Sequence, residues 1–134
     1  MAPVIVAGAI KVLDILSRST DRRDKLEWNA AYWRKLLVDA GFDVKKGDSP
    51  IVPVMLYNAK LAQDVARDLF AEGIYVVGFF FPVVPKGQAR IRTQLSAAHE
   101  KAHLDRAIEA FRKVGKKHDL LGKDKTAIIQ QYGL

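Results

Sequence analysis

Residues 78–99 read GFFFPVVPKGQARIRTQLSAAH, and the secondary-structure pattern changes twice within this stretch. An apolar run ends at Pro82, a second proline follows at Pro85, and Gly87 precedes alternating apolar and polar residues from Ala89 onward. This order predicts a strand, a loop and a second strand. Because proline fixes its own φ and favours an extended predecessor, we expect a stiff loop that forms one wall of a pocket.

The alternation places Arg90 and Arg92 on one face of the second strand, since successive strand residues point to opposite sides. A guanidinium offers a planar fork of N–H donors that matches a carboxylate, and it stays charged at any working pH. Either arginine is therefore a candidate for binding a substrate carboxylate. Both also suit a solvated sheet face or ion pairs with helix carboxylates, and the residues alone leave these interpretations open.

The rest of the chain predicts four long helices and further short strands. Apolar residues recur at helical spacing from Pro3 to about Ser17, from about Ser19 to Ala40, from Asn58 to Glu72 and from Glu100 to Lys117. Strands are expected over 42–44, 51–57, 74–81 and 89–96. Pro53 favours an edge position or a bulge in its strand. The order predicts an α+β domain with a small, mainly antiparallel sheet covered by helices.

Aromatic and histidine side chains have both structural and functional interpretations. Phe70 is expected to face the core with the apolar residues of its helix. Trp28 and Trp33 point in different directions on a helix, so we expect Trp33 in the core and Trp28 at an edge or an interface. His99 and His103 have the i, i+4 spacing of a zinc-binding pair. No metal site is predicted, because a clear third ligand is lacking and His99 is expected to precede the helix.

The composition limits the class of protein. The 134 residues suit one domain, and 49% apolar residues can supply a core. The sequence contains no cysteine, which excludes disulfides and thiolate chemistry and fits the expected cytoplasmic location. No apolar stretch is long enough to cross a bilayer, so a membrane is not expected as a partner.

The net charge of +7, from 22 lysines and arginines against 15 acidic residues, raises the possibility of a polyanionic partner. The basic residues are spread along the chain, and the clusters Arg22-Arg23, Lys45-Lys46 and Lys116-Lys117 are only doublets. The run from Phe79 to Phe81 is too apolar for an exposed stacking platform. Nucleic acid is therefore not expected as a partner.

Residues 82–99 resemble the C-terminal signature of the α-oxoamine synthases, and most closely that of the glycine C-acetyltransferase branch. Two upstream runs agree: DKLEWNA at 24–30 and SPIVPVML at 49–56, followed by EGIYV at 72–76. We interpret residues 1–122 as the C-terminal domain of such an enzyme. Residues 123–134 depart from the family pattern and are expected to form a short extra helix or a disordered tail.

The resemblance implies the small domain of a fold-type I enzyme that depends on pyridoxal phosphate (PLP), with active sites between domains and near a homodimer interface. In that family the second arginine of the Arg-Ile-Arg run holds the amino-acid carboxylate; this is Arg92 here, with Arg90 as the runner-up. The pocket loop on the acyl-coenzyme A side would comprise Phe81, Pro82, Val83, Val84, Pro85 and Lys86. No lysine of this chain has the Ser/Thr- and Gly-rich surroundings of the family's Schiff-base lysine, which implies a missing large domain and an inactive isolated chain.

The resemblance implies substrate recognition in an enzyme that joins glycine and acetyl-coenzyme A to give 2-amino-3-ketobutyrate and coenzyme A during threonine degradation. One alternative is a sibling synthase that makes 8-amino-7-oxononanoate or 5-aminolevulinate. An alternative of another class is a stand-alone basic module that binds nucleic acid or a protein.

Overall fold

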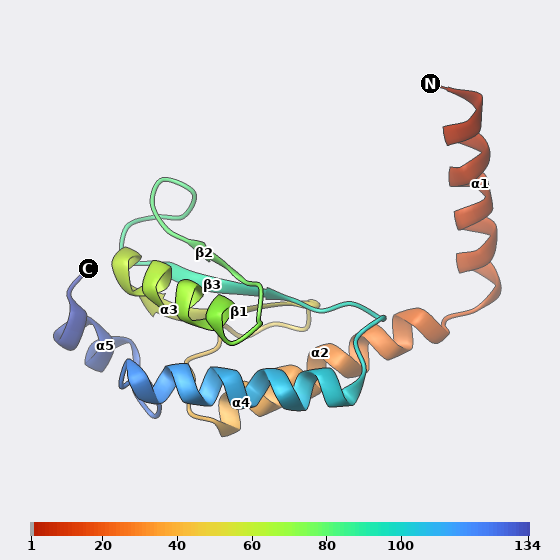
Figure 1. Cartoon of the computed structure of the whole chain (residues 1–134). Helices are drawn as coiled ribbons and strands as arrows, with labels where there is room; N and C mark the ends of the chain where they lie inside the picture. The colour runs from red at the N-terminus through yellow and green to blue at the C-terminus, as the bar shows by residue number, and fades with distance from the viewer. Residues whose placement is uncertain (1) are drawn as a thin grey trace.

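The order of elements in the computed structural model is α, α, β, α, β, β, α, α over residues 2–134, the part of the chain that it describes (Figure 1). The bounds are α1 Pro3–Arg18, α2 Asp21–Asp39, β1 Ile51–Tyr57, α3 Ala59–Ala71, β2 Val77–Phe79, β3 Ala89–Gln94, α4 Lys101–Lys117 and α5 Lys125–Tyr132. The predicted α+β class and the four long helices are confirmed.

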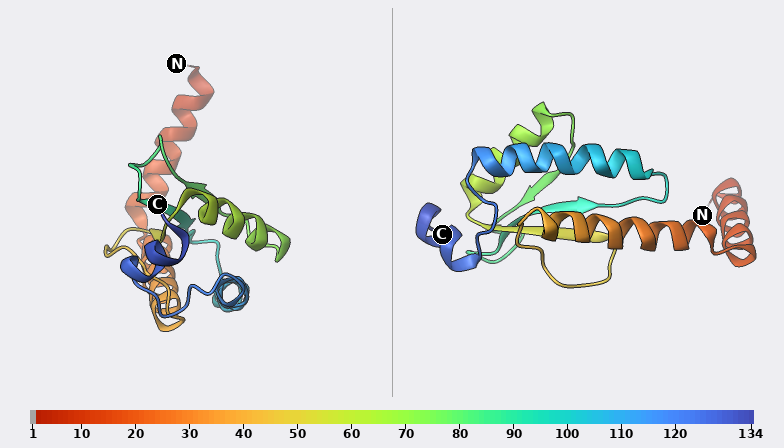
Figure 2. Two further views of the ribbon diagram at one scale, coloured as in Figure 1. Left: turned by 90° about the vertical axis from the view of Figure 1, so that its left-hand side faces the viewer. Right: turned by 90° about the horizontal axis from the view of Figure 1, so that it is seen from below.

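The sheet has the strand order β1-β3-β2, and both strand pairs are antiparallel, as predicted. Ile91 at the centre of β3 lies opposite Val54 on β1 and Gly78 on β2. Alternate residues of β3 are buried in a core to which α2, α3 and α4 contribute side chains. The ribbons of these helices lie along one side of the sheet (Figure 2). Pro53 lies on β1, an outer strand of this order, and the register shifts between Met55 and Tyr57, so both features predicted for this strand occur.

Two predicted strands are shorter than expected. Residues 42–44 contribute only a single bridge, from Val44 to Val54, instead of a strand. The strand predicted over 74–81 is regular only at Val77–Phe79. At the start of this segment the Ile74 amide donates to the Leu69 carbonyl, so these residues end α3 and do not extend the strand. Its end already belongs to the turn in which the carbonyl of Phe80 accepts two amide hydrogen bonds.

The prediction for Phe70 is wrong, because its side chain is 67% exposed. The buried residues of α3 are Leu61, Ala62, Val65 and Leu69. Phe70 follows Leu69 by one position, and successive residues of an α-helix lie about 100° apart around its axis. The side chain of Phe70 therefore points away from the face of α3 that packs on the core. It packs instead edge-on against Tyr75, with ring centroids 6.5 Å apart.

The core is centred on an aromatic group between α2 and α4. Trp33 is 3% exposed, as predicted, and the ring of Phe111 packs edge-on against both Trp33 and Phe42. Gly115 makes this packing possible, because a Cβ at that position would lie 2.7 Å from the Phe42 ring. Trp28 is 50% exposed and stacks on a neighbouring tyrosine, which agrees with its predicted place at an edge.

Residues 125–132 form the short helix that was one of the two alternatives for the tail. Asp124 caps it by accepting a hydrogen bond from the Ala127 amide, and Ile128 is buried in the core. The Tyr132 hydroxyl donates to the carbonyl of His118. These contacts attach α5 to the end of α4 and to β1.

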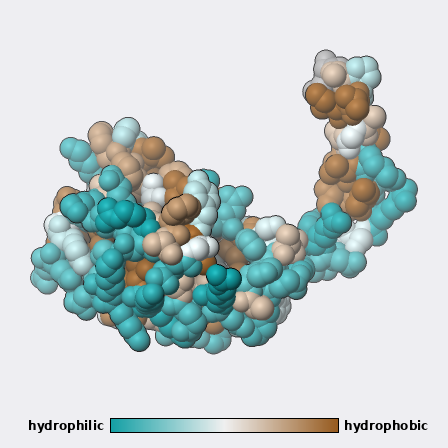
Figure 3. Space-filling model, in the orientation of Figure 1, coloured by the Kyte–Doolittle hydropathy of each residue, from teal (hydrophilic) through white to brown (hydrophobic). Residues whose placement is uncertain are grey.

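Helix α1 projects away from the rest of the domain, and none of its residues is buried (Figure 3). Its exposed large apolar residues are Val4, Ile5, Val6, Ile10, Val12, Leu13, Ile15 and Leu16. The charged residues Lys11, Asp14 and Arg18 pair with one another on one side of the helix. A helix that is apolar around most of its circumference is typical of a buried helix. Within residues 2–134 no helix has both the length and the apolar character needed to span a membrane.

We expect the isolated chain to self-associate through α1, because association removes this apolar surface from water at about 25 cal/mol per Å². Size-exclusion chromatography with light scattering at two protein concentrations should show a mass that rises with concentration. Replacing Ile10 and Leu13 together by lysine should restore the monomer, whereas the control Val38→Lys, at an exposed position of α2, should not. A monomeric wild-type chain at both concentrations would contradict this expectation.

Asp68 joins α3 to the end of α4 through Lys117 and His118. Its Oδ2 lies 2.8 Å from Lys117 Nζ and 2.7 Å from His118 Nε2, and its side chain is 15% exposed. The hydrogen bonds from Lys117 and His118 lower the pKa of Asp68 below its ordinary value of 3.8. The ionised carboxylate therefore stabilises the fold above that pH, and its contribution is lost as the pH falls through the lowered pKa.

Asp68→Asn should reduce the free energy of unfolding by about 1–2 kcal/mol at pH 7, since it removes the charge from these hydrogen bonds. The difference from wild type should narrow as the pH falls below about 3.8, because the unfolded chain takes up a proton at Asp68 before the folded chain does. Urea unfolding at pH 7 and pH 3 measures both values. Asp64→Asn is the control, because Asp64 pairs only within its own helix; an equal loss in the two variants would count against a role for Asp68 between helices.

Candidate functional site

Arg92 lies on the outer face of β3, the face that the helices do not cover. It stands opposite Pro53 on β1 and Val77 on β2, and its side chain is exposed. Its guanidinium carbon lies 4.6 Å from the centroid of the Phe79 ring. Among residues 2–134 no carboxylate forms an ion pair with Arg92, so its N–H groups are available to a ligand.

Arg90 shares this face of the sheet, as predicted, but has a different environment. It is half-buried, and its Nε donates to the Gln88 carbonyl at 3.1 Å. One of its terminal nitrogens lies 3.4 Å from the side-chain oxygen of Gln88. Because these donors are engaged locally, Arg90 is less available to a ligand than Arg92.

A hollow of about 330 Å³ lies beside Arg92 at the end of the sheet where α3 runs into β2. It is lined by Tyr75, Val76, Val77, Arg92, Gln94, Leu95 and Ser96. Arg92 is the one charged residue of this lining, which otherwise offers an amide, two hydroxyls and apolar side chains. One cation without a nearby acid, in a small hollow, suits a small carboxylate.

The predicted pocket loop lies elsewhere. None of its six residues, Phe81 to Lys86, lines the hollow beside Arg92. The loop follows β2 at the opposite end of that strand, with Phe81 and Val83 exposed and Lys86 Nζ 5.3 Å from the centre of the Phe81 ring. Gly87 has a φ of +74°, a conformation that favours glycine, where the loop turns toward β3. The structure therefore brings Arg92 together with residues 75–77 and 94–96 rather than with the loop.

Hydrogen bonds on the inner side of the sheet fix the position of β3. The buried Thr93 hydroxyl donates to the Val52 carbonyl at 2.6 Å and accepts from Trp33 Nε1 at 3.0 Å. Just beyond the strand, the buried Asn29 amide nitrogen donates to the carbonyls of Ser96 and His99, each at 2.9 Å. The alternating pattern predicted that Thr93 points into the core. Nothing in the sequence indicated that Asn29 would bond to the carbonyl of Ser96, 67 residues away.

Residues 99–103 read HEKAH, which matches the H-E-x-x-H pattern of zinc metalloproteases. That pattern requires both histidines on one helix, but His99 precedes α4. Nδ1 of His99 accepts from the Ser96 amide and Nδ1 of His103 from the Glu100 amide, each at 3.0 Å. In the described part of the chain no group of three metal-binding side chains occurs. These histidines therefore close the turn before α4.

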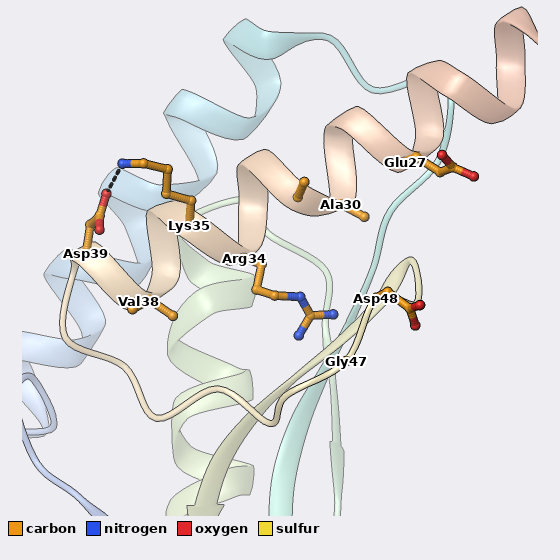
Figure 4. A pocket seen from close by; sticks show the side chains of 9 residues that line it. Glu27, Ala30, Arg34, Lys35, Val38, Asp39, Gly47 and Asp48 are labelled. Atoms are coloured by element: carbon orange, nitrogen blue, oxygen red, sulfur yellow. Dashed lines mark hydrogen bonds and ion pairs between the residues drawn. The ribbon is translucent and has the colours of Figure 1, made fainter.

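A larger hollow of about 690 Å³ lies between α2 and the segment that precedes β1 (Figure 4). Three of its five charged side chains, those of Arg34, Lys35 and Asp39, are engaged with the protein itself. Arg34 donates to the carbonyls of Lys45 and Ser49, and Lys35 Nζ lies 2.6 Å from Asp39 Oδ2. Arg34 thus holds the segment before β1 against α2, and the hollow is a weaker candidate than the one beside Arg92.

Comparison with known proteins identifies the class of protein to which this fold belongs. The family model of aminotransferase class I and II matches residues 1–111, and the chain belongs to this family. Among individual proteins, it is 53% identical over 116 residues to the 2-amino-3-ketobutyrate coenzyme A ligase of Escherichia coli K12, which covers 87% of this chain and 29% of that enzyme. The 8-amino-7-oxononanoate synthase of Thermosipho melanesiensis is 44% identical over 117 residues, covering 87% and 30%.

A solved structure agrees with these sequence relatives. The serine palmitoyltransferase of S. paucimobilis with bound PLP–myriocin aldimine aligns with a TM-score of 0.71 and 26% identity, over 75% of this chain and 26% of that one. The predicted resemblance to the PLP-dependent α-oxoamine synthases is confirmed. The chain spans about three tenths of the length of the curated relatives that it matches.

The residues beside Arg92 do not by themselves form a PLP site, because no lysine lines the hollow. A lysine that bonds to an aldehyde must lose its proton, which a lowered pKa favours. The pKa of Lys35 is instead raised by its hydrogen bond to Asp39, and that of Lys101 by its hydrogen bond to Asp105. Neither amine is prepared for this chemistry.

The anchoring role of Thr93 gives a test of how the site is built. Thr93→Val should lower the free energy of unfolding by about 1–3 kcal/mol, because it leaves the Trp33 N–H and the Val52 carbonyl without their partner. Thr93→Ser keeps the hydroxyl and should retain most of that stability. Urea unfolding of both variants measures the difference, and equal stability of the valine and serine variants would refute the role of the hydroxyl.

Proposed function

We propose that this chain is the substrate-recognition domain of a PLP-dependent glycine C-acetyltransferase, in which Arg92 binds the carboxylate of glycine or of 2-amino-3-ketobutyrate. The observation that carries the proposal is an exposed guanidinium, free of acidic partners within the described residues, beside a small hollow. The 53% identity to 2-amino-3-ketobutyrate coenzyme A ligase supports this substrate class. The complete enzyme would join glycine and acetyl-coenzyme A and release coenzyme A.

The roles within such an enzyme divide between this chain and a larger PLP-binding domain. PLP, when bound there, withdraws electrons from the α-carbon of glycine and so makes its proton easier to remove. The Schiff-base lysine belongs to that domain in our proposal. Arg92 contributes orientation, because two parallel N–H···O contacts fix both oxygens of a carboxylate. A fixed carboxylate determines where the α-carbon lies relative to the reacting groups.

The loop from Phe81 to Lys86 has a separate proposed role, on the acyl-coenzyme A side. Its exposed Phe81 and Val83 offer apolar contact, and Lys86 offers a positive charge to a phosphate. Because the loop and the hollow lie at opposite ends of β2, they would contact different parts of the bound substrates.

The proposed partners are the large domain and a second subunit of the complete enzyme, which acts as a homodimer. The apolar surface of α1 and the open face of the sheet are available for these contacts. We also propose a cytoplasmic location, which the absence of cysteine supports.

A second candidate function is that of 8-amino-7-oxononanoate synthase, which is favoured by the 44% identity to the Thermosipho melanesiensis enzyme. The two activities differ in the amino acid and the acyl group that they use. Comparing glycine, alanine and serine as substrates of an assembled enzyme would distinguish them.

The test is a chimera in which this chain replaces the matching segment of the Escherichia coli ligase. Arg92→Ala should lower kcat/KM for glycine about 30-fold or more, since a lost charged bidentate contact is worth about 2–4 kcal/mol. Arg90→Ala is the matched control and should have a milder effect, because Arg90 is held by Gln88. A change below threefold for Arg92→Ala, or equal losses in both variants, would reject the assignment.

A further inference from the structure

We propose that Phe79 is the positioning residue of the site: its ring supports one face of the Arg92 guanidinium, so that a small carboxylate binds edge-on from the hollow. This inference rests on the proposed carboxylate-binding function of Arg92. It adds a residue outside the predicted pocket loop and specifies the direction from which the ligand approaches.

The strand register puts the two side chains together. Val77 lies opposite Arg92 and Phe79 opposite Arg90 in the antiparallel pair of β2 and β3. Phe79 is therefore the diagonal neighbour of Arg92 on the same face of the sheet, within reach of a long side chain. The guanidinium carbon is 4.6 Å from the ring centroid, inside the distance of about 6 Å at which a cation is attracted to an aromatic face.

The contact with Phe79 uses no carboxylate or carbonyl acceptor, so the N–H donors of Arg92 remain available to a ligand. The N–H groups of a guanidinium lie in its plane, whereas stacking uses the face. An arginine held by local hydrogen bonds has these donors occupied, as the contacts of Arg90 with Gln88 illustrate. In our proposal the contact with Phe79 restricts the motion of the Arg92 side chain and leaves its donors to the ligand, so less conformational freedom is lost when a ligand binds.

The surroundings specify the ligand. Phe79 lies toward the Arg90 end of β3, whereas the hollow is lined by residues 75–77 and 94–96 at the other end. A ligand in the hollow therefore approaches Arg92 from the side away from the ring. Gln94 follows Arg92 by two positions on the same face and lines the hollow, so its amide borders the same ligand. The site suits a small monocarboxylate with a polar substituent.

Nuclear magnetic resonance of the ¹⁵N-labelled chain tests the proposal, with acetate as the probe and chloride at equal ionic strength as the reference. The Nε–Hε signal of Arg92 is assigned by its loss in Arg92→Lys. In wild type, the Arg92 side-chain protons should be shifted upfield by the ring, and acetate should move the Nε–Hε signal. Phe79→Leu should abolish the upfield shift and weaken acetate binding about two- to fivefold, the range for an exposed cation–π contact.

The conservative variant Phe79→Trp should keep both the upfield shift and the acetate affinity. If Phe79 only filled space, neither property would have to be kept. Trp28→Leu is the control, because Trp28 is an exposed aromatic residue on α2 that does not contact the site. Absence of the upfield shift in wild type, or unchanged acetate binding in Phe79→Leu, would overturn the positioning role. An intact upfield shift with no acetate response would instead reject the carboxylate-binding function, and edge-on binding with it.

Discussion

The antiparallel pairing of β3 with strands on both sides is the constraint on which the rest of the structure depends. A strand in this position has one side chain in two directed into the core, and the others are left on the opposite face. Ala89, Ile91 and Thr93 are buried, while Arg92 and Gln94 are exposed. Shifting the register by one residue would exchange the two faces of the strand. The same backbone hydrogen bonds therefore keep the apolar side chains in the core and Arg92 on the exposed face.

The domain has a well-packed core and yet leaves two surfaces without cover. Side chains from α2 to α5 and the sheet bury one another, whereas α1 and the outer face of the sheet contribute little to that core. Exposed apolar surface such as that of α1 marks contact surfaces in proteins. Their presence is consistent with a chain that spans 29% of the length of its Escherichia coli relative.

The functional proposal combines two kinds of observation that do not depend on each other. Membership of the aminotransferase class I and II family indicates the cofactor chemistry of the complete enzymes. The geometry of this chain indicates a more limited task, since the hollow beside Arg92 offers a single cation and no lysine. In the proposed site, Phe79 holds the Arg92 guanidinium, whose N–H groups would orient a substrate for the reacting groups of the large domain.

The sequence by itself determined the four long helices, the α+β class, the inward and outward sides of β3 and the family, because these follow from local periodicity and from motifs. Only the tertiary structure decided the short extent of β2, the exposure of Phe70 and the anchoring of β3 by Asn29. It also showed that Gln88 engages the donors of Arg90, and it separated the loop after Phe81 from the hollow. The physical reason is that these features depend on contacts between residues far apart in the chain or on the packing around a side chain, and neither leaves a periodic signal in the sequence.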